Sequence, residues 1–100
     1  MRDPLIKRRS ALKTKYGITL EQFDNMLIEQ GFRCAICGKH QKDYPRNFSV
    51  DHNHKTLFVR GLLCAYCNGL VLKYLGDNKK RAEGIVKYLT RALGKDPGWQ

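Results

Sequence analysis

Apolar residues recur every three or four positions in two stretches of the chain, and this spacing predicts two amphipathic helices. The first helix begins after Thr19, which can form a capping box with Gln22. Ile18 precedes this cap and can pack onto Phe23 as a hydrophobic staple. We expect the helix to end at Gly31 and to lead the chain into a cysteine motif. Its apolar face consists of Leu20, Phe23, Met26 and Leu27.

The second amphipathic helix is predicted over residues 79–93. Gly94 is suited to end it, and Pro97 prevents its continuation. We expect the apolar residues of this C-terminal segment to pack on the small core, although they could instead form an interface between two copies of the chain. The residues concerned are Val86, Leu89, Leu93 and Trp99.

A third helix, rich in basic residues, is predicted at the N-terminus. Asp3 followed by Pro4 is typical of an N-cap and a first helical residue. The helix is expected to continue to about Tyr16, and Gly17 closes it. It has a thin apolar stripe available for packing, formed by Leu5, Leu12 and Tyr16.

Between these helices the pattern changes to short extended segments. Residues 48–52 and 57–60 are predicted to be two strands joined by a turn at 53–56, after a polar loop over 39–47. A short helix is then expected to open at Cys64. The chain is thus predicted to be a small α+β domain, with a hairpin and a short helix flanked by N- and C-terminal helices.

The four cysteines stand in two Cys-x-x-Cys pairs. A chain of 100 residues buries a modest core and is often stapled by a further interaction. The N-terminus has no apolar secretory segment, so a reducing compartment is expected, where disulfides are disfavoured. A redox motif usually occurs as a single pair. The sequence therefore predicts a structural zinc ion bound by Cys34, Cys37, Cys64 and Cys67.

The chain is strongly basic. It has 19 Lys and Arg residues against nine Asp and Glu residues, and this balance favours a polyanionic partner, with nucleic acid ahead of membrane lipid. No apolar run approaches the ~20 residues that a membrane span requires. On the C-terminal helix the basic face could equally be an ordinary solvated surface. The expected phosphate contacts are Lys55, Arg60, Lys73, Lys80, Lys87 and Arg91.

Residues typical of a hydrolytic metal site occur around the predicted hairpin. Asp51 and Asn68 offer one carboxylate and one amide oxygen, which suit Mg²⁺ because this ion retains most of its waters. His52 is the candidate general base, since an imidazole titrates near neutral pH. Successive residues of a strand point to opposite faces, so Asp51 and His52 need a kink or a strand end to serve one site.

Other interpretations of the same residues remain open. The Asp-His-Asn-His segment could be a hydrophilic turn with solvated histidines, and Asn68 could be a helix cap. His54 is expected to be a neighbour of the active site or a substrate contact, with a bystander role as the alternative. Asp51, His52 and Asn68 occur together at a spacing compatible with one ββα unit, and this favours the catalytic interpretation.

These motifs resemble the phage recombination endonuclease VII family, within the His-Me finger (HNH, ββα-metal) nucleases. The resemblance covers roughly residues 12–76. It is carried by Val50-Asp51-His52-Asn53-His54, by Val59-Arg60-Gly61-Leu62-Leu63-Cys64 with Cys67-Asn68, and by the lead-in segments 15–23 and 34–38.

The resemblance implies a single domain with three parts. These are a basic helical part over 1–31, a zinc-bound ββα nuclease core over 32–76, and a C-terminal helix and tail over 77–100. The four cysteines would bind structural zinc, while Asp51 and Asn68 would bind the catalytic Mg²⁺ or Mn²⁺. His52 would be the general base, and His54 matches a second histidine often present in the motif.

The implied activity is that of a metal-dependent endonuclease that cuts double-stranded or branched DNA. A monomer would nick one strand and a homodimer could cut both, in the cytoplasm of a bacterial host and from a phage or prophage gene. Asn53 stands where the family commonly has Asp, and the expected region for branched-DNA recognition is reduced to the C-terminal helix and tail. The contrasting hypothesis is a non-catalytic, zinc-stabilised module that binds nucleic acid.

Overall fold

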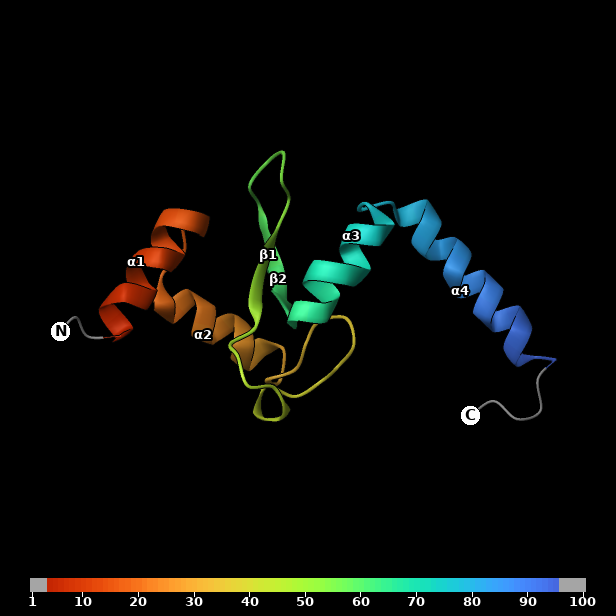
Figure 1. The fold of residues 1–100 in the computed structure, drawn as a ribbon, viewed down its shortest axis with the longest axis horizontal. Helices are drawn as coiled ribbons and strands as arrows, with labels where there is room; N and C mark the ends of the chain where they lie inside the picture. Colours follow the sequence, from red (N-terminus) through yellow and green to blue (C-terminus); the bar gives the residue numbers. More distant parts are fainter. Residues whose placement is uncertain (1–3, 96–100) are drawn as a thin grey trace.

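The fold consists of helices arranged around one antiparallel β-hairpin (Figure 1). The structure is a computed structural model that describes residues 4–95. It measures 58 × 31 × 22 Å, so the molecule is elongated. In chain order the elements are α1 (Pro4–Tyr16), α2 (Leu20–Glu29), the 3₁₀ turn η1 (Gln41–Asp43), β1 (Ser49–His52), β2 (Val59–Leu63), the π-helical segment η2 (Cys67–Val71), α3 (Leu72–Leu75) and α4 (Lys79–Leu93). The predicted α+β class is confirmed.

The predicted start of α2 is confirmed in detail. The Thr19 hydroxyl accepts a hydrogen bond from the Gln22 N–H at 3.0 Å, and the Gln22 amide oxygen accepts one from the Thr19 N–H at 2.7 Å. Ile18 and Phe23 are both buried in the same cluster. The end of α1 also lies where expected, because Gly17 adopts a φ of +71°. The predicted cap Asp3 lies outside the described residues.

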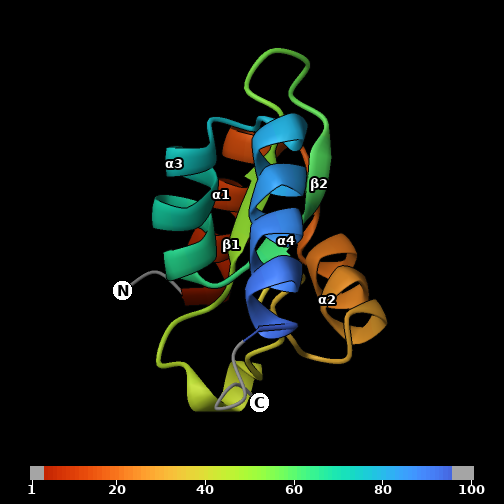
Figure 2. The same cartoon turned by 90° about the vertical axis from the view of Figure 1, so that its right-hand side faces the viewer.

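The second strand differs from its prediction. It begins at Val59 and ends at Leu63, so residues 57 and 58 belong to the turn. The cause is Asn53, whose side-chain oxygen accepts hydrogen bonds from the N–H groups of Lys55 and Thr56 and so builds a longer turn. Figure 2 shows this turn projecting beyond the helices.

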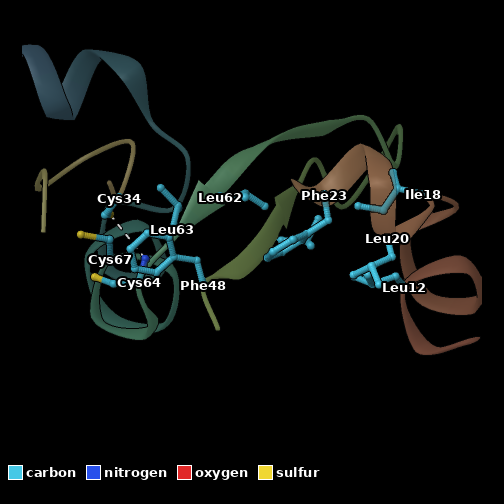
Figure 3. Close-up of a cluster of buried hydrophobic side chains, with 11 residues drawn as sticks. Leu12, Ile18, Leu20, Phe23, Cys34, Phe48, Leu62, Leu63, Cys64 and Cys67 are labelled. Atoms are coloured by element: carbon cyan, nitrogen blue, oxygen red, sulfur yellow. Dashed lines mark hydrogen bonds between the residues drawn. The ribbon is translucent and has the colours of Figure 1, made fainter. Parts of the chain in front are cut away.

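The buried core runs along the hairpin from the helices to the cysteines (Figure 3). Phe23 and Leu62 are almost fully buried at its centre. Gln30 joins α2 to β2, because its amide group both donates to the Leu62 carbonyl at 3.0 Å and accepts from the Leu62 N–H at 2.9 Å. A side chain at Gly61 would place its Cβ 3.4 Å from that amide oxygen, so the glycine leaves room for this contact.

Helix α4 lies apart from this core. It occurs at the predicted residues, with the Asn78 side chain accepting from the Arg81 N–H at 3.0 Å. However, no residue within Lys79–Leu93 is buried, and α4 extends away from the hairpin beyond α3 (Figure 1). The prediction that its apolar residues pack on the core is therefore wrong: Val86, Leu89 and Leu93 are 63%, 42% and 40% exposed. Trp99 lies outside the described residues.

The turn that precedes α4 explains why this helix lies apart from the core. Gly76 and Asp77 both have positive φ angles, of 62° and 57°, and this left-handed turn directs the next helix outward. None of the helices in residues 4–95 is long and apolar enough to cross a membrane.

Candidate functional site

The two Cys-x-x-Cys pairs meet at one point. The sulfur atoms of the four cysteines all lie within 4.8 Å of one another, and none of them forms a disulfide. The Cys37 and Cys64 sulfurs are 3.8 Å apart. A tetrahedral zinc site with Zn–S bonds of about 2.3 Å has sulfur atoms about 3.8 Å from each other. The cluster thus has the ligands and the spacing to hold a zinc ion.

The backbone around the cluster favours the thiolate form of Cys34. Burial would raise the pKa of the Cys34 thiol, but hydrogen bonds from backbone N–H groups, chiefly those of Cys37 and Cys64, lower it to about 6. Burial, followed by hydrogen bonding to the Cys64 thiol, raises the pKa of Cys67. One thiolate therefore forms readily, whereas the full set needs a bound cation to share the charge.

A second candidate site is a cavity of about 660 Å³ between the hairpin, η2–α3 and the end of α1. It is lined by the predicted catalytic and metal-binding residues and by two of the six predicted phosphate contacts. These are Asp51, His52, His54, Asn68, Arg60 and Lys73. The tertiary structure brings these six residues to one place from the hairpin before the second cysteine pair and from the helix after it.

An irregularity in the hairpin lets Asp51 and His52 line the same cavity. Asp51 pairs with Gly61, but His52 pairs with Val59, so Arg60 is an extra residue in β2. Such a β-bulge bends the strand and increases its twist. The kink that the strand alternation required is therefore present, and it lies within the hairpin pairing.

Asp51 is a buried carboxylate held by an arginine. It is 8% exposed, and Arg60 donates to both of its oxygens, from Nε to Oδ2 at 2.7 Å and from Nη2 to Oδ1 at 3.0 Å. Arg60 Nη2 also lies 3.3 Å from Asp77 Oδ1. Hydrogen bonding to Asp51 is the main cause that raises the pKa of Arg60. The cavity thus has a carboxylate whose negative charge is balanced by a cation.

The two histidines lie side by side at the hairpin end. Their ring centroids are 4.7 Å apart, and the ring of Tyr16 from α1 lies 5.5 Å from that of His52. His52 is half-buried between these two rings, whereas His54 is exposed. This places His54 beside the candidate base.

Asn68 reaches the cavity from the helix that carries the second cysteine pair. Its N–H donates to the Cys64 carbonyl at 3.0 Å, and the π-helical turn begins at the adjacent Cys67. Wide turns of this kind often occur at functional sites. Metal binding at the cysteines would therefore fix the position of Asn68 relative to β1.

The donor set of the cavity fits a hard divalent cation. Asp51 and Asn68 supply a carboxylate and an amide oxygen, which Mg²⁺ and Mn²⁺ accept together with water. Within residues 4–95, the four cysteines are the one cluster of three or more Cys, His, Asp or Glu ligands.

The remaining predicted contacts lie elsewhere. Lys55 is in the exposed hairpin turn, and Lys80, Lys87 and Arg91 are exposed on α4, away from the cavity lining. Tyr16 and Asp77 line the cavity without having been assigned to it from the sequence. Asp77 belongs to the turn before α4, and no spacing rule connects it to Arg60, 17 residues away.

Comparison with known proteins gives a consistent result. The model of the recombination endonuclease VII family matches residues 9–91. The gene 59 protein of Mycobacterium phage D29 is 41% identical over 76 residues, which are 76% of this chain and 46% of that protein. The gene 59 protein of Mycobacterium phage L5 is 39% identical over 74 residues, which are 74% of this chain and 44% of that protein.

The chain therefore spans less than half the length of these curated relatives. No solved structure gives a significant match. The match of the family model over most of the chain shows that this protein belongs to the recombination endonuclease VII family.

Proposed function

We propose that this protein is a metal-dependent endonuclease that hydrolyses phosphodiester bonds in double-stranded or branched DNA. The observation that carries the proposal is the convergence of Asp51, His52 and Asn68 on one cavity of a strongly basic chain from an endonuclease family. The hairpin and the η2–α3 helix would then form a ββα-metal (His-Me finger) core.

In this proposal each cavity residue has a distinct role. Asp51 and Asn68 hold the Mg²⁺ or Mn²⁺ ion. When bound, this ion polarises the scissile phosphate and stabilises charge on the leaving oxygen. His52 accepts a proton from the attacking water, and its partly exposed position leaves it accessible to that water. The products carry 5′-phosphate and 3′-hydroxyl ends.

The neighbouring side chains support this geometry. Tyr16 packs against one side of the His52 ring and His54 lies on another, so the imidazole is restricted in orientation. His54 is exposed and lies within the cavity, where it can contact a phosphate oxygen. Lys73 lines the same cavity and is placed to attract the backbone of the substrate.

The zinc centre has a structural role in the proposal. Its ligands come from the segment after α2 and from the helix that carries Asn68, so zinc joins the two halves of the core. The basic residues of the hairpin turn and α4 would extend the contact with DNA phosphates. Affinity for DNA is therefore expected to fall steeply as the salt concentration rises.

The test is cleavage of supercoiled plasmid in the presence of Mg²⁺, Mn²⁺ or EDTA. The parent protein is compared with His52→Asn and with the matched control His40→Asn. His40 lies outside the cavity and accepts a hydrogen bond from the Lys42 N–H, which asparagine can also do. The proposal requires metal-dependent cutting by the parent and the control, and none by His52→Asn.

The same assay distinguishes a monomeric nuclease from a homodimer and tests the binding-module hypothesis. A dominant open-circle product indicates nicking by a monomer, and early linear product indicates paired cutting by a homodimer. If all three proteins bind DNA in a salt-sensitive manner but none cuts plasmid or a four-way junction, the binding-module hypothesis replaces the proposal.

A further inference from the structure

Arg60 occupies a position between two carboxylates of the cavity. Its Nη2 atom is 3.0 Å from Asp51 Oδ1 and 3.3 Å from Asp77 Oδ1, while its Nε atom is 2.7 Å from Asp51 Oδ2. The guanidinium thus uses both oxygens of Asp51 and touches Asp77 with one edge. Charge-assisted bidentate pairs of this kind are among the stronger hydrogen-bonded contacts in proteins.

The two carboxylates differ in their access to water. The Asp51 side chain is 11% exposed, whereas that of Asp77 is 41% exposed. An uncompensated buried carboxylate is strongly destabilising. A positive charge beside Asp51 therefore stabilises the protein, and in this structure Arg60 supplies that charge.

Asp77 is held towards Arg60 by an unfavourable backbone conformation. Its φ of +57° directly follows the positive φ of Gly76. A non-glycine residue in this region costs energy and persists when its surroundings favour it. The ion pair with Arg60 favours this conformation of Asp77. It places a carboxylate acceptor next to the guanidinium on the solvent side.

A divalent cation and Arg60 compete for the same oxygens. An ionised carboxylate has about four lone-pair sites, and Arg60 takes one on each oxygen of Asp51. A dication bound to Asp51 would also repel the adjacent guanidinium, because the site is partly shielded from water. Binding of the cation would therefore weaken the contact between Arg60 and Asp51.

From these contacts we propose that Arg60 is a positioning residue. It fixes the orientation of the Asp51 carboxylate before the divalent cation binds. When Asp51 binds the cation, Arg60 pairs with Asp77 instead. This inference rests on the proposed function of the cavity. In the new position the guanidinium remains paired and faces the open side of the cavity, where it can contact a substrate phosphate. Asp77 acts through Arg60 and is not itself a ligand.

The test measures Mn²⁺ binding to the zinc-loaded protein without DNA, by titration calorimetry and by the electron paramagnetic resonance signal of free Mn²⁺. Arg60→Gln is expected to bind Mn²⁺ about tenfold more tightly than the parent, because a charged competitor is removed. Arg60→Lys keeps the charge but loses the bidentate contact and is expected to be intermediate. Arg46→Gln removes the same charge from the loop before β1, outside the cavity lining, and should leave the affinity unchanged.

The role of Asp77 is tested by a double-mutant cycle. Asp77→Asn is expected to weaken Mn²⁺ binding about threefold in the parent, because Arg60 then has no alternative partner. In the Arg60→Gln background the same change should have no effect. An equal effect in both backgrounds would show that Asp77 is a direct ligand. It would contradict the proposal that Arg60 changes its partner from Asp51 to Asp77.

The remaining outcomes distinguish this inference from the proposed function. Unchanged or weaker Mn²⁺ binding by Arg60→Gln and Arg60→Lys, with normal zinc content and thermal unfolding, would show that Arg60 merely orients Asp51. If Asp51→Asn binds Mn²⁺ as well as the parent, the proposed metal site and this inference are both wrong.

Discussion

The cysteine cluster and the cavity both include residues of the η2 turn, and they differ in how they balance charge. At the cysteines, buried sulfur atoms converge from two segments, and backbone N–H groups favour charge before any cation is present. At the cavity, a single buried carboxylate is kept neutralised by Arg60. The first arrangement suits permanent binding of a soft metal, and the second suits exchange of one cation for another.

The comparison also explains why Asn68 follows Cys67 directly. Cys67 belongs to the cysteine cluster, and Asn68 lines the cavity. A small chain can therefore use one metal to set the geometry of a second site. The zinc end should control folding, while the cavity should control chemistry.

Loss of one cysteine is expected to have the largest effect. Cys64→Ser removes a buried sulfur from the cluster and should lower the free energy of unfolding by more than about 5 kcal/mol, because structural zinc binding supplies folding free energy. Circular dichroism and zinc analysis would then show an unfolded, metal-free chain. A folded Cys64→Ser protein would contradict the view that zinc controls folding.

Selective removal of metals should separate the two regions. Exchange into buffer without Mg²⁺ is expected to stop cleavage reversibly while the helical signal and zinc content remain. A zinc chelator should cause both to be lost together with the fold. The measurement is cleavage, zinc content and circular dichroism on the same sample. If zinc can be removed with the circular dichroism signal unchanged, the cluster does not stabilise the domain.

A change at Asn68 should affect the chemistry alone. Asn68→Ala keeps the backbone contact to the Cys64 carbonyl but removes the amide oxygen from the cavity. Cleavage is expected to fall at least about 100-fold, while the unfolding midpoint stays close to that of the parent. The control is Asn53→Asp, which keeps an oxygen to cap the hairpin turn and should retain cleavage. Equal activity of Asn68→Ala and the parent would remove Asn68 from the site.

The smallest effect is expected on α4, which belongs to neither region. Val86→Ser replaces an exposed apolar residue, so the free energy of unfolding should change by no more than about 0.5 kcal/mol. Urea unfolding of the parent and the variant would measure this difference. A loss of about 2 kcal/mol that depends on protein concentration would show that α4 is covered by a second copy of the chain.

Local patterns were sufficient for much of the fold. The capping box at Thr19, the end of α1 at Gly17 and the position of α4 all follow from contacts between residues close in the chain. The two cysteine pairs were recognisable for the same reason, since the ligand spacing within each pair is local. The start of β2 was not predicted correctly, because the side chain of Asn53 lengthens the turn before it.

The amino-acid sequence by itself determined the chemistry that is available: four thiols in two pairs, one Asp-His step, one asparagine after a cysteine and a large positive charge. The tertiary structure decided which of these residues meet. The bulge at Arg60, its pairing with Asp51 and Asp77, and the exposure of α4 all depend on strand register and on positive-φ turns. Contacts between residues 9 to 17 positions apart depend on the path of the whole chain, and residue spacing does not encode that path.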